Sequence, residues 1–274
     1  MRIDQLLVQR GLASTRSQAQ RLIADGVEWK NGEIWKRIAK NGDDVPDEAA
    51  IRLLDDSEAR YVSRGGLKLE HALKAVGLDV TGLACLDVGQ STGGFTDCLL
   101  QHGASTVVGV DVGSAQLHPS LRQDARVLCV EKVNARSLCA SDLIAAYADS
   151  TGEDGQFSSE VAAEELATEF PAEFDVLVAD LSFISQTLVL PAVVAFLKPG
   201  GTLLTLVKPQ FELQPGQVGK GGVVRDAQMY PLVESRLRDA CGELGLIVSH
   251  WFDSPIDGGD GNREFFICAR KPAH

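Results

Sequence analysis

The sequence predicts an α/β protein in which a doubly wound, Rossmann-like sheet follows a small, separate α+β unit. An apolar run at residues 83–88 is followed by glycines and then by apolar residues at helical spacing, which is the strand–turn–helix unit that opens such a sheet. Further apolar runs each end at a charged residue: 106–110, 127–130, 174–179 and 202–207. The first 56 residues carry helix and hairpin signals of their own.

The size and charge of the chain limit its class. A chain of 274 residues can form one sizeable domain and a small one. The net charge of −12 by itself argues against a nucleic-acid partner. However, residues 137–197 contain many acids and no Lys or Arg. The sum therefore does not exclude a basic face elsewhere in the chain.

The cysteines and the apolar stretches argue against metal and membrane proteins. The six cysteines, at 85, 98, 129, 139, 241 and 268, lack the paired spacing of a metal site. We expect no metal, and reduced, buried thiols in a cytoplasmic protein. No secretory signal is visible, and the longest charge-free apolar stretch, residues 187–197, is too short to span a bilayer. We expect no membrane partner, and a monomer.

Residues 1–56 are predicted to form the separate unit. Apolar residues at helical spacing predict a first helix that ends near Gly11. Ser14 is a good N-cap for a second helix over residues 15–24. Asn31-Gly32 then reads as the turn of a tight hairpin. From these features alone, a small packing domain with a solvated charged face remains an alternative to a binding unit.

One stretch of this unit resembles the S4 RNA-binding domain. The stretch is Leu-Leu-Val-Gln-Arg-Gly-Leu-Ala-Ser-Thr-Arg-Ser-Gln-Ala at residues 6–19, followed by Leu-Ile-Ala-Asp-Gly-Val at 22–27. The resemblance implies contacts with structured RNA, which is recognised through shape and phosphates. The basic residues expected to bind RNA are Arg2, Arg10, Arg16, Arg21, Lys36 and Arg64.

The glycine turn after the strand at 83–88 is predicted to bind a ligand. Glycines allow a ligand to approach backbone N–H groups at a helix start. Asp87 lies at the end of the strand, where a carboxylate would repel a diphosphate but attract a cationic amino group. The turn therefore favours S-adenosylmethionine over NAD. A strand–helix turn without a ligand is the alternative.

Two further residues support a nucleoside ligand. Asp111 follows the second strand, where an acid can bind ribose hydroxyls in both NAD and S-adenosylmethionine sites. Asn134 follows the third strand, and it could either read an adenine edge or cap a turn. Together they indicate a nucleoside without identifying it.

The next segments separate an acidic insertion from the second half of the sheet. Residues 145–173 are rich in Asp and Glu and contain no cation. We expect a solvated insertion that is flexible in its first half and helical over 159–168. Residues 55–60 read as a polar linker, residues 187–197 as a helix and residues 199–201 as a turn.

Two charged residues end the fourth and fifth strands. Asp180 follows the run at 174–179, and Lys208 follows the run at 202–207. Both are therefore expected at the carboxyl edge of the sheet, where ligands bind. A lysine at the end of an apolar strand is costly unless it has a functional role.

The glycine-rich stretch at 217–226 is a candidate lid or substrate loop, or a plain connection. A helix at 229–244 and a closing hairpin, 246–252 with 264–269, complete the chain.

The whole chain resembles the TlyA family of ribosomal RNA 2′-O-methyltransferases, historically called haemolysins. The motifs are Tyr-Val-Ser-Arg-Gly-Gly at 61–66, residues 87–96, Asp-Leu-Ser-Phe-Ile-Ser at 180–185, Val-Lys-Pro-Gln-Phe-Glu at 207–212 and residues 219–226. The catalytic part is similar to FtsJ-type RNA ribose methyltransferases, whose Lys-Asp-Lys-Glu tetrad falls on Lys68, Asp180, Lys208 and Glu264. The residues expected at the methyl-donor site are Asp87, Gly89, Ser91, Thr92, Gly93, Gly94, Phe95, Asp111, Val112, Asn134 and Asp180.

The resemblance implies an S4-like RNA-binding domain at 1–56, a linker at 57–62 and a methyltransferase domain at 63–271. It implies S-adenosylmethionine-dependent 2′-O-methylation of a cytidine ribose, with ribosomal RNA or its subunits as partner. Because the chain lacks the short terminal extensions described for members that act on both subunits, 23S rRNA is the expected main target, with 16S rRNA as a second possibility. The alternatives are an inactive ribosome-assembly factor, a membrane-active haemolysin and an NAD-dependent dehydrogenase. All four tetrad positions are present, which argues against the first. The haemolysin would need a cationic amphipathic helix that is absent.

Overall fold

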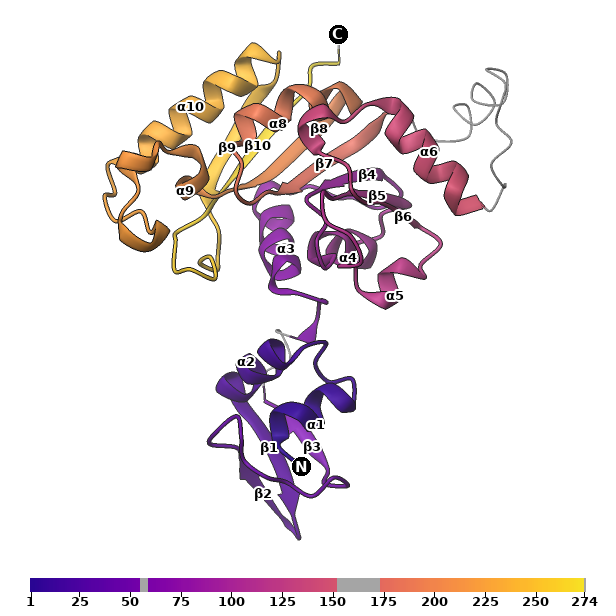
Figure 1. Ribbon diagram of the computed structural model, residues 1–274, viewed down its shortest axis with the longest axis vertical. Helices are drawn as coiled ribbons and strands as arrows, with labels where there is room; N and C mark the ends of the chain where they lie inside the picture. The colour runs from indigo at the N-terminus through magenta and orange to yellow at the C-terminus, as the bar shows by residue number, and fades with distance from the viewer. Residues whose placement is uncertain (55–58, 152–172, 274) are drawn as a thin grey trace. The chain divides into compact units, whose positions relative to one another are not determined.

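The computed structural model describes residues 1–54, 59–151 and 173–273. It divides the chain into two compact units, Met1–Leu67 and Lys68–His274. Each unit is treated separately below (Figure 1). Most of the predicted linker at 55–60 and most of the acidic insertion, including the helix predicted at 159–168, lie outside the described residues.

The first unit packs two helices on a three-stranded antiparallel sheet. Helices α1 (Ile3–Gln9) and α2 (Arg16–Gly26) precede strands β1 (Val27–Asn31), β2 (Ile34–Arg37) and β3 (Ile51–Leu53). The strand order is β2-β1-β3. Its core consists of apolar residues at the spacing that predicts the helices, including Ile3, Leu6, Leu7, Leu22 and Ile23.

Three details of this unit differ from the sequence prediction. The N-cap of α2 is Thr15, whose side chain accepts a hydrogen bond from the Gln18 N–H, so the assignment of the cap to Ser14 is wrong. Asn31 pairs with Ile34, which shifts the hairpin turn by one residue to 32–33. Strand β3 is not predicted, because three residues are too short to show an alternating pattern.

The second unit is built on a seven-stranded sheet with the order β6-β5-β4-β7-β8-β10-β9. The bounds are β4 Ala84–Val88, β5 Thr106–Val110, β6 Val127–Val130, β7 Phe174–Asp180, β8 Leu197–Val207, β9 Ile247–Asp253 and β10 Phe265–Arg270. Strands β4 to β8 are parallel, and β10 runs antiparallel to both β8 and β9. The predicted doubly wound sheet and its closing hairpin are confirmed.

Helices cover both faces of this sheet. Figure 1 shows α6, α8 and α10 on one side and α3, α4 and α5 on the other. The bounds are α3 Arg64–Val76, α4 Gly94–Gln101, α5 Pro119–Arg122, α6 Ala140–Thr151, α8 Gln186–Val193, α9 Pro209–Glu212 and α10 Met229–Glu243. The second unit also contains short 3-10 helices: η2 Ala135–Ser137, η3 Val194–Phe196, η4 Pro215–Gln217 and η5 Lys220–Gly222. Both faces of the inner strands are covered, which agrees with their mostly apolar sequences.

Four predictions in this unit are corrected. The helix predicted to Leu197 ends earlier, because Leu197 already pairs with Phe174 as the start of β8. The predicted turn at 199–201 lies within β8, where Gly200 adopts φ +78° and the pairing with β7 shifts register. Residues 145–151 belong to α6, and Tyr147 packs on the core, so this part of the predicted insertion is regular helix. Cys139 is exposed, which corrects the expectation that the thiols are buried.

Candidate active site

The order in which strands are added to the sheet reverses at β4, and a cavity of about 480 Å³ lies at that point. From β4 the chain continues to β5 and β6 on one side and later to β7 and β8 on the other. Crevices at such switch points, outside the carboxyl ends of the strands, bind ligands in open α/β sheets. Six residues predicted for the methyl-donor site line the cavity: Gly89, Ser91, Asp111, Val112, Asn134 and Asp180.

The turn between β4 and α4 has backbone geometry that only small residues allow. Gly89 has φ +84°, and a Cβ there would lie 2.6 Å from the Asp180 carbonyl oxygen. Gly93 has φ +94°, and a Cβ there would lie 2.4 Å from the Leu121 side chain. The glycines therefore let this turn pack between β7 and α5 while its backbone faces the cavity.

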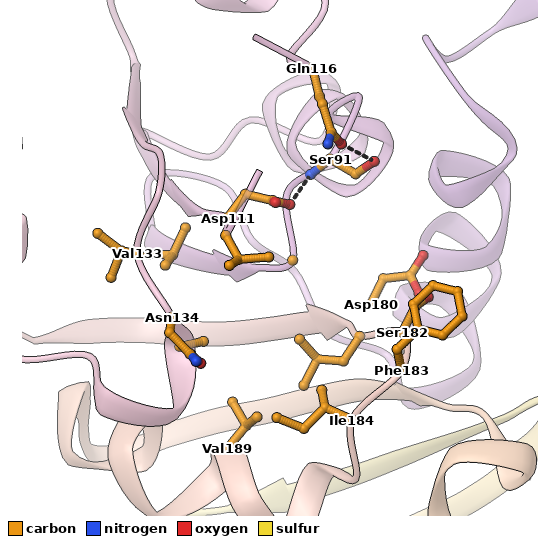
Figure 2. Close-up of a pocket in the computed structure, with 15 residues that line it drawn as sticks. Ser91, Asp111, Gln116, Val133, Asn134, Asp180, Ser182, Phe183, Ile184 and Val189 are labelled. Carbon is orange, nitrogen blue, oxygen red and sulfur yellow. Dashed lines mark hydrogen bonds between the residues drawn. The ribbon is translucent and has the colours of Figure 1, made fainter. Parts of the chain in front are cut away.

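Asp111 is held in a fixed orientation at the end of β5. Its two carboxylate oxygens accept hydrogen bonds from the N–H groups of Ser91 and Gly113, each at 2.7 Å. Figure 2 shows Asp111 on one side of the cavity and Asp180, Ser182 and Phe183 on the other. A fixed carboxylate that faces a cavity can accept hydrogen bonds from a diol such as ribose.

Of the two roles that the sequence leaves open for Asn134, the structure shows the turn cap. Its Oδ1 caps η2 by accepting a hydrogen bond from the Arg136 N–H at 3.1 Å, while the residue also lines the cavity. Four other predicted donor-site residues are not among the cavity-lining residues: Asp87, Thr92, Gly93 and Gly94. A fifth, Phe95, is 3% exposed and stacks on Phe266, so its side chain belongs to the core.

Asp87 lies beneath the turn, in a buried polar chain. Gln90 Nε2 donates to Thr96 Oγ1 at 2.9 Å, and Thr96 Oγ1 donates to Asp87 Oδ2 at 2.7 Å. Asp87 Oδ1 has no hydrogen-bond partner among the described residues. Burial raises the pKa of Asp87 to about 7, and the nearby Asp180 and Asp111 carboxylates add to this. A cationic group near Asp87 would favour its charged form. Asp111 and Asn134, which do line the cavity, are the residues that fit the S-adenosylmethionine predicted here.

The raised pKa of Asp87 predicts a specific pH dependence of stability. The folded state holds the proton up to about pH 7, whereas the unfolded state releases it near pH 3.8. Stability of the donor-free protein should therefore fall as pH rises between these values, and Asp87→Asn should remove that fall. At pH 8 the variant should be more stable by on the order of 3–4 kcal/mol, measured by urea unfolding.

The control for this experiment is Asp79→Asn. Hydrogen bonds from Thr81 hold the pKa of Asp79 below its usual value, so its charged form is favoured on folding. This substitution should leave the wild-type fall above pH 4 in place. If Asp87→Asn has the same pH profile as the wild type, Asp87 is not the group that titrates.

The four tetrad residues gather beside the cavity as two ion pairs. Lys208 Nζ lies 2.5 Å from Asp180 Oδ1 and donates to Ser182 Oγ at 2.8 Å. Lys68 Nζ lies 2.5 Å from Glu264 Oε2, and both side chains are less than a tenth exposed. Burial raises the pKa of Glu264, while the charges of Lys68 and Lys208 oppose the rise.

Strand register explains why residues so far apart in sequence meet. Phe265 of β10 pairs with Val207 of β8, so Glu264 and Lys208 are the next residues at the same edge. Asp180 of β7 pairs with Leu206 on the other side of β8. Lys68 comes from α3, the helix that precedes the sheet.

Sequence reasoning missed residues that hold this edge in place. Ser182 Oγ accepts a hydrogen bond from Lys208. Buried Glu212 accepts hydrogen bonds from Ser185 Oγ at 2.5 Å and from the Gln186 N–H at 2.8 Å. Ser182 and Glu212 both lie inside the motifs at 180–185 and 207–212, and these motifs were the sequence signal that could have identified them. Phe183 is 91% exposed at φ +65° beside the cavity, an uncommon conformation for an aromatic residue.

Several of the cations predicted to bind RNA also hold the first unit together. Arg2 and Arg16 both bond the buried carboxylate of Asp4, which lowers the pKa of that carboxyl group far below its usual value. Arg10 donates to the carbonyls of Asp47 and Ala49. The side chains of Arg2 and Arg16 remain about half exposed, and Lys36 is exposed. Arg21 and Arg64 are half-buried.

Comparison with known families agrees with this geometry. A family model described as FtsJ-like methyltransferase matches residues 61–271, and one described as the S4 domain matches residues 1–26. The chain belongs to the FtsJ-like methyltransferase family. The resemblance that the sequence motifs indicate is thereby confirmed, and the methyl donor of this methyltransferase is S-adenosylmethionine.

Relatives of this methyltransferase cover nearly its whole length. It is 40% identical over 269 residues to the 16S/23S rRNA (cytidine-2′-O)-methyltransferase TlyA of Mycobacterium tuberculosis, across 98% of this chain and 89% of that protein. It is 29% identical to the 23S rRNA (cytidine-2′-O)-methyltransferase TlyA of Campylobacter jejuni, across 97% of this chain and 98% of that protein. A solved structure from Streptococcus thermophilus that carries a hemolysin name is 37% identical, covers 99% of this chain and 88% of its own, and has a TM-score of 0.67.

Proposed function

We propose that this methyltransferase moves a methyl group from S-adenosylmethionine to the ribose 2′-OH of a cytidine in ribosomal RNA, chiefly 23S rRNA. The observation that carries the proposal is the pair of ion pairs, Lys208–Asp180 and Lys68–Glu264, at the edge of the donor cavity. The names of both curated relatives specify 23S rRNA, and one also specifies 16S rRNA. Such work would take place in the cytoplasm.

In this proposal the bound donor supplies an electrophilic methyl group, and the residues of the chain orient the 2′-OH and remove its proton. Asp180 and Ser182 fix the Lys208 amine at the cavity edge. Lys208 accepts the 2′-OH proton as the oxygen attacks, so the ammonium of its ion pair with Asp180 must first have released one proton to the solvent. Glu264 holds Lys68 where its charge can stabilise the developing oxyanion. Asp111 would hold the donor ribose.

The direct test is mass mapping of ribose methylation on both ribosomal RNAs from cells with and without the protein. The proposal expects one cytidine in 23S rRNA to lose its 2′-O-methyl group when the protein is absent. Purified protein should also methylate isolated large subunits. Unchanged methylation in cells, with no activity on purified subunits, would instead support the inactive assembly factor. Efficient methylation of small subunits would extend the substrate to 16S rRNA.

Within the described ranges 1–54, 59–151 and 173–273, none of the helices is long and apolar enough to cross a membrane.

We predict that the first unit supplies RNA affinity and the second supplies the chemistry. The donor cavity and all four tetrad residues lie in the second unit, Lys68–His274. A protein that begins at residue 60 should therefore keep its affinity for S-adenosylmethionine, measured by calorimetry. Its binding to large subunits, measured by co-sedimentation, should weaken at least about tenfold, because the S4 cations are gone. Equal methylation of subunits by the truncated and full-length proteins would show that this division is wrong.

A further inference from the structure

A buried asparagine outside the tetrad and the donor cavity joins two segments of the second unit. Asn262, in the connection between β9 and β10, is 1% exposed. Its Oδ1 accepts a hydrogen bond from the Val224 N–H at 2.9 Å, and its Nδ2 donates to the Gly222 carbonyl at 2.9 Å. The same Nδ2 donates to Asp260 Oδ2 at 2.8 Å. A buried amide whose donors and acceptor are all hydrogen-bonded holds the bonded backbone segments in place.

The neighbouring carboxylate extends this connection toward Lys208. Asp260 Oδ1 accepts from the Asn262 N–H at 3.0 Å, and Asp260 Oδ2 accepts from Gln210 Nε2 at 3.1 Å. Gln210 lies two residues after Lys208, and Asn262 lies two residues before Glu264. These hydrogen bonds connect the glycine-rich segment to the residues just after β8, which include Lys208, and to the residues just before β10, which include Glu264.

The glycine-rich segment, residues 219–226, is a formed loop that presents two cations. The Gly219 N–H bonds the Val223 carbonyl, and the Gly222 N–H bonds the Gly219 carbonyl. Gly221 and Gly222 adopt φ +80° and +81°, and a Cβ on either would meet open space. Glycine is therefore favoured here by the positive φ angles and not by a lack of space. Lys220 and Arg225 of this loop are exposed.

The charges around the loop leave its cations available to a polyanion. Lys220 and Arg225 form no ion pair with the residues that the structure describes. The Asp260 carboxylate already accepts three hydrogen bonds. Asp226 is the exposed acid within the loop, and its Oδ1 accepts from the Gln228 N–H.

We propose that Asn262 is a positioning residue that fixes the 219–226 loop at the tetrad edge, so that Lys220 and Arg225 hold the RNA phosphates that flank the target ribose. This inference rests on the proposed function, because a ribose that reaches the tetrad brings its own flanking phosphates. Cations held in a fixed position can contact those phosphates without first ordering the loop, whereas a loose loop would lose the entropy of ordering on each binding event. The loop is therefore assigned to RNA contact and not to the methyl donor.

The test is a double-mutant cycle read out by the salt dependence of RNA binding. Binding of the full-length protein to isolated large subunits is measured between about 50 and 200 mM KCl. Lys220→Ala with Arg225→Ala should make the slope of log K against log salt shallower by about 1–2, because two phosphate contacts are lost. In the Asn262→Ala background the same two substitutions should change the slope by less than half as much, because the loop is no longer fixed.

The control removes the same charge elsewhere. Arg126→Ala with Arg238→Ala deletes two exposed arginines that pair with Asp124 and Glu234. This control should leave the slope within about 0.5 of wild type, since neither residue lies in the loop. All variants should keep wild-type affinity for S-adenosylmethionine, which a general loss of structure would not allow.

The outcomes separate this inference from the proposed function. An unchanged slope in the Lys220/Arg225 variant, or equal slope changes with and without Asn262, would overturn the role of the loop. Methylation of ribosomal RNA by the wild-type protein with either result would leave the proposed function intact. A wild-type protein that methylates no ribosomal RNA would overturn the proposed function, and the slopes would still decide whether the loop binds subunits.

Discussion

Replacing Lys208 by alanine is expected to lower the single-turnover rate of methyl transfer by about 10²–10⁴-fold, the usual contribution of general-base catalysis. The amine lies between Asp180 and Ser182 at the cavity edge and is the proposed acceptor of the 2′-OH proton. Affinity for S-adenosylmethionine should stay within a few-fold of wild type, because Lys208 is not among the residues that line the donor cavity. Rapid-quench kinetics on large subunits would measure the rate.

The matched variant is Lys208→Arg, which keeps the positive charge but cannot act as a base. Because guanidinium stays protonated at any pH that the protein survives, this variant should be as inactive as Lys208→Ala. If Lys208→Arg retains a near-native rate at neutral pH, Lys208 acts through its charge alone and another group takes the proton.

Glu264→Gln is expected to cost both stability and turnover. The Lys68–Glu264 pair is almost fully buried, with side chains 9% and 2% exposed. Removal of one partner would leave the Lys68 ammonium without its counter-charge in the interior, which typically costs about 3–5 kcal/mol. The free energy of unfolding, measured in urea, should fall by about that amount. The single-turnover rate should fall at least about tenfold, because Lys68 loses its orientation.

A double replacement distinguishes the structural from the catalytic contribution. Lys68→Met with Glu264→Leu removes both charges and keeps the volume, a change that is often neutral or stabilising for buried pairs. We expect stability close to wild type together with loss of methyl transfer. If the double variant is as active as wild type, the pair is only structural and the tetrad assignment fails for Lys68 and Glu264.

The sequence predicts the elements whose signal is local. Strands β5 and β6 have the predicted bounds, because each is an apolar run that stops at an acid. Asp180 and Lys208 could be assigned to one sheet edge for the same reason, since parallel strands place their carboxyl ends together. The order of β7 and β8 in the sheet then places their side chains near each other, as the 2.5 Å pair shows.

The remaining differences come from choices that local sequence leaves open. Ser14 and Thr15 are both good N-caps, and in the structure it is Thr15 whose side chain accepts the hydrogen bond from the Gln18 N–H. Gly200 looks like a turn signal, yet it lies within β8, where its N–H donates to the carbonyl of Lys271, just after β10. Asp87 ends an apolar strand as expected, but its hydrogen-bond partner Thr96, and Gln90, which donates to Thr96, come from the helix and the turn that follow. Asn262 gives no sequence signal, because its partners lie 38 and 40 residues away.

The antiparallel insertion of β10 between β8 and β9 sets the order in which the enzyme can be completed during synthesis. Glu264 meets Lys68 across 196 residues, and it reaches that position only when β10 has entered the sheet. Until then β8 has an unpaired edge and β9 has no neighbour, which is an aggregation-prone state for a nascent chain. A chain that stops before β10 therefore cannot form the Lys68–Glu264 ion pair, and its β8 edge stays unpaired.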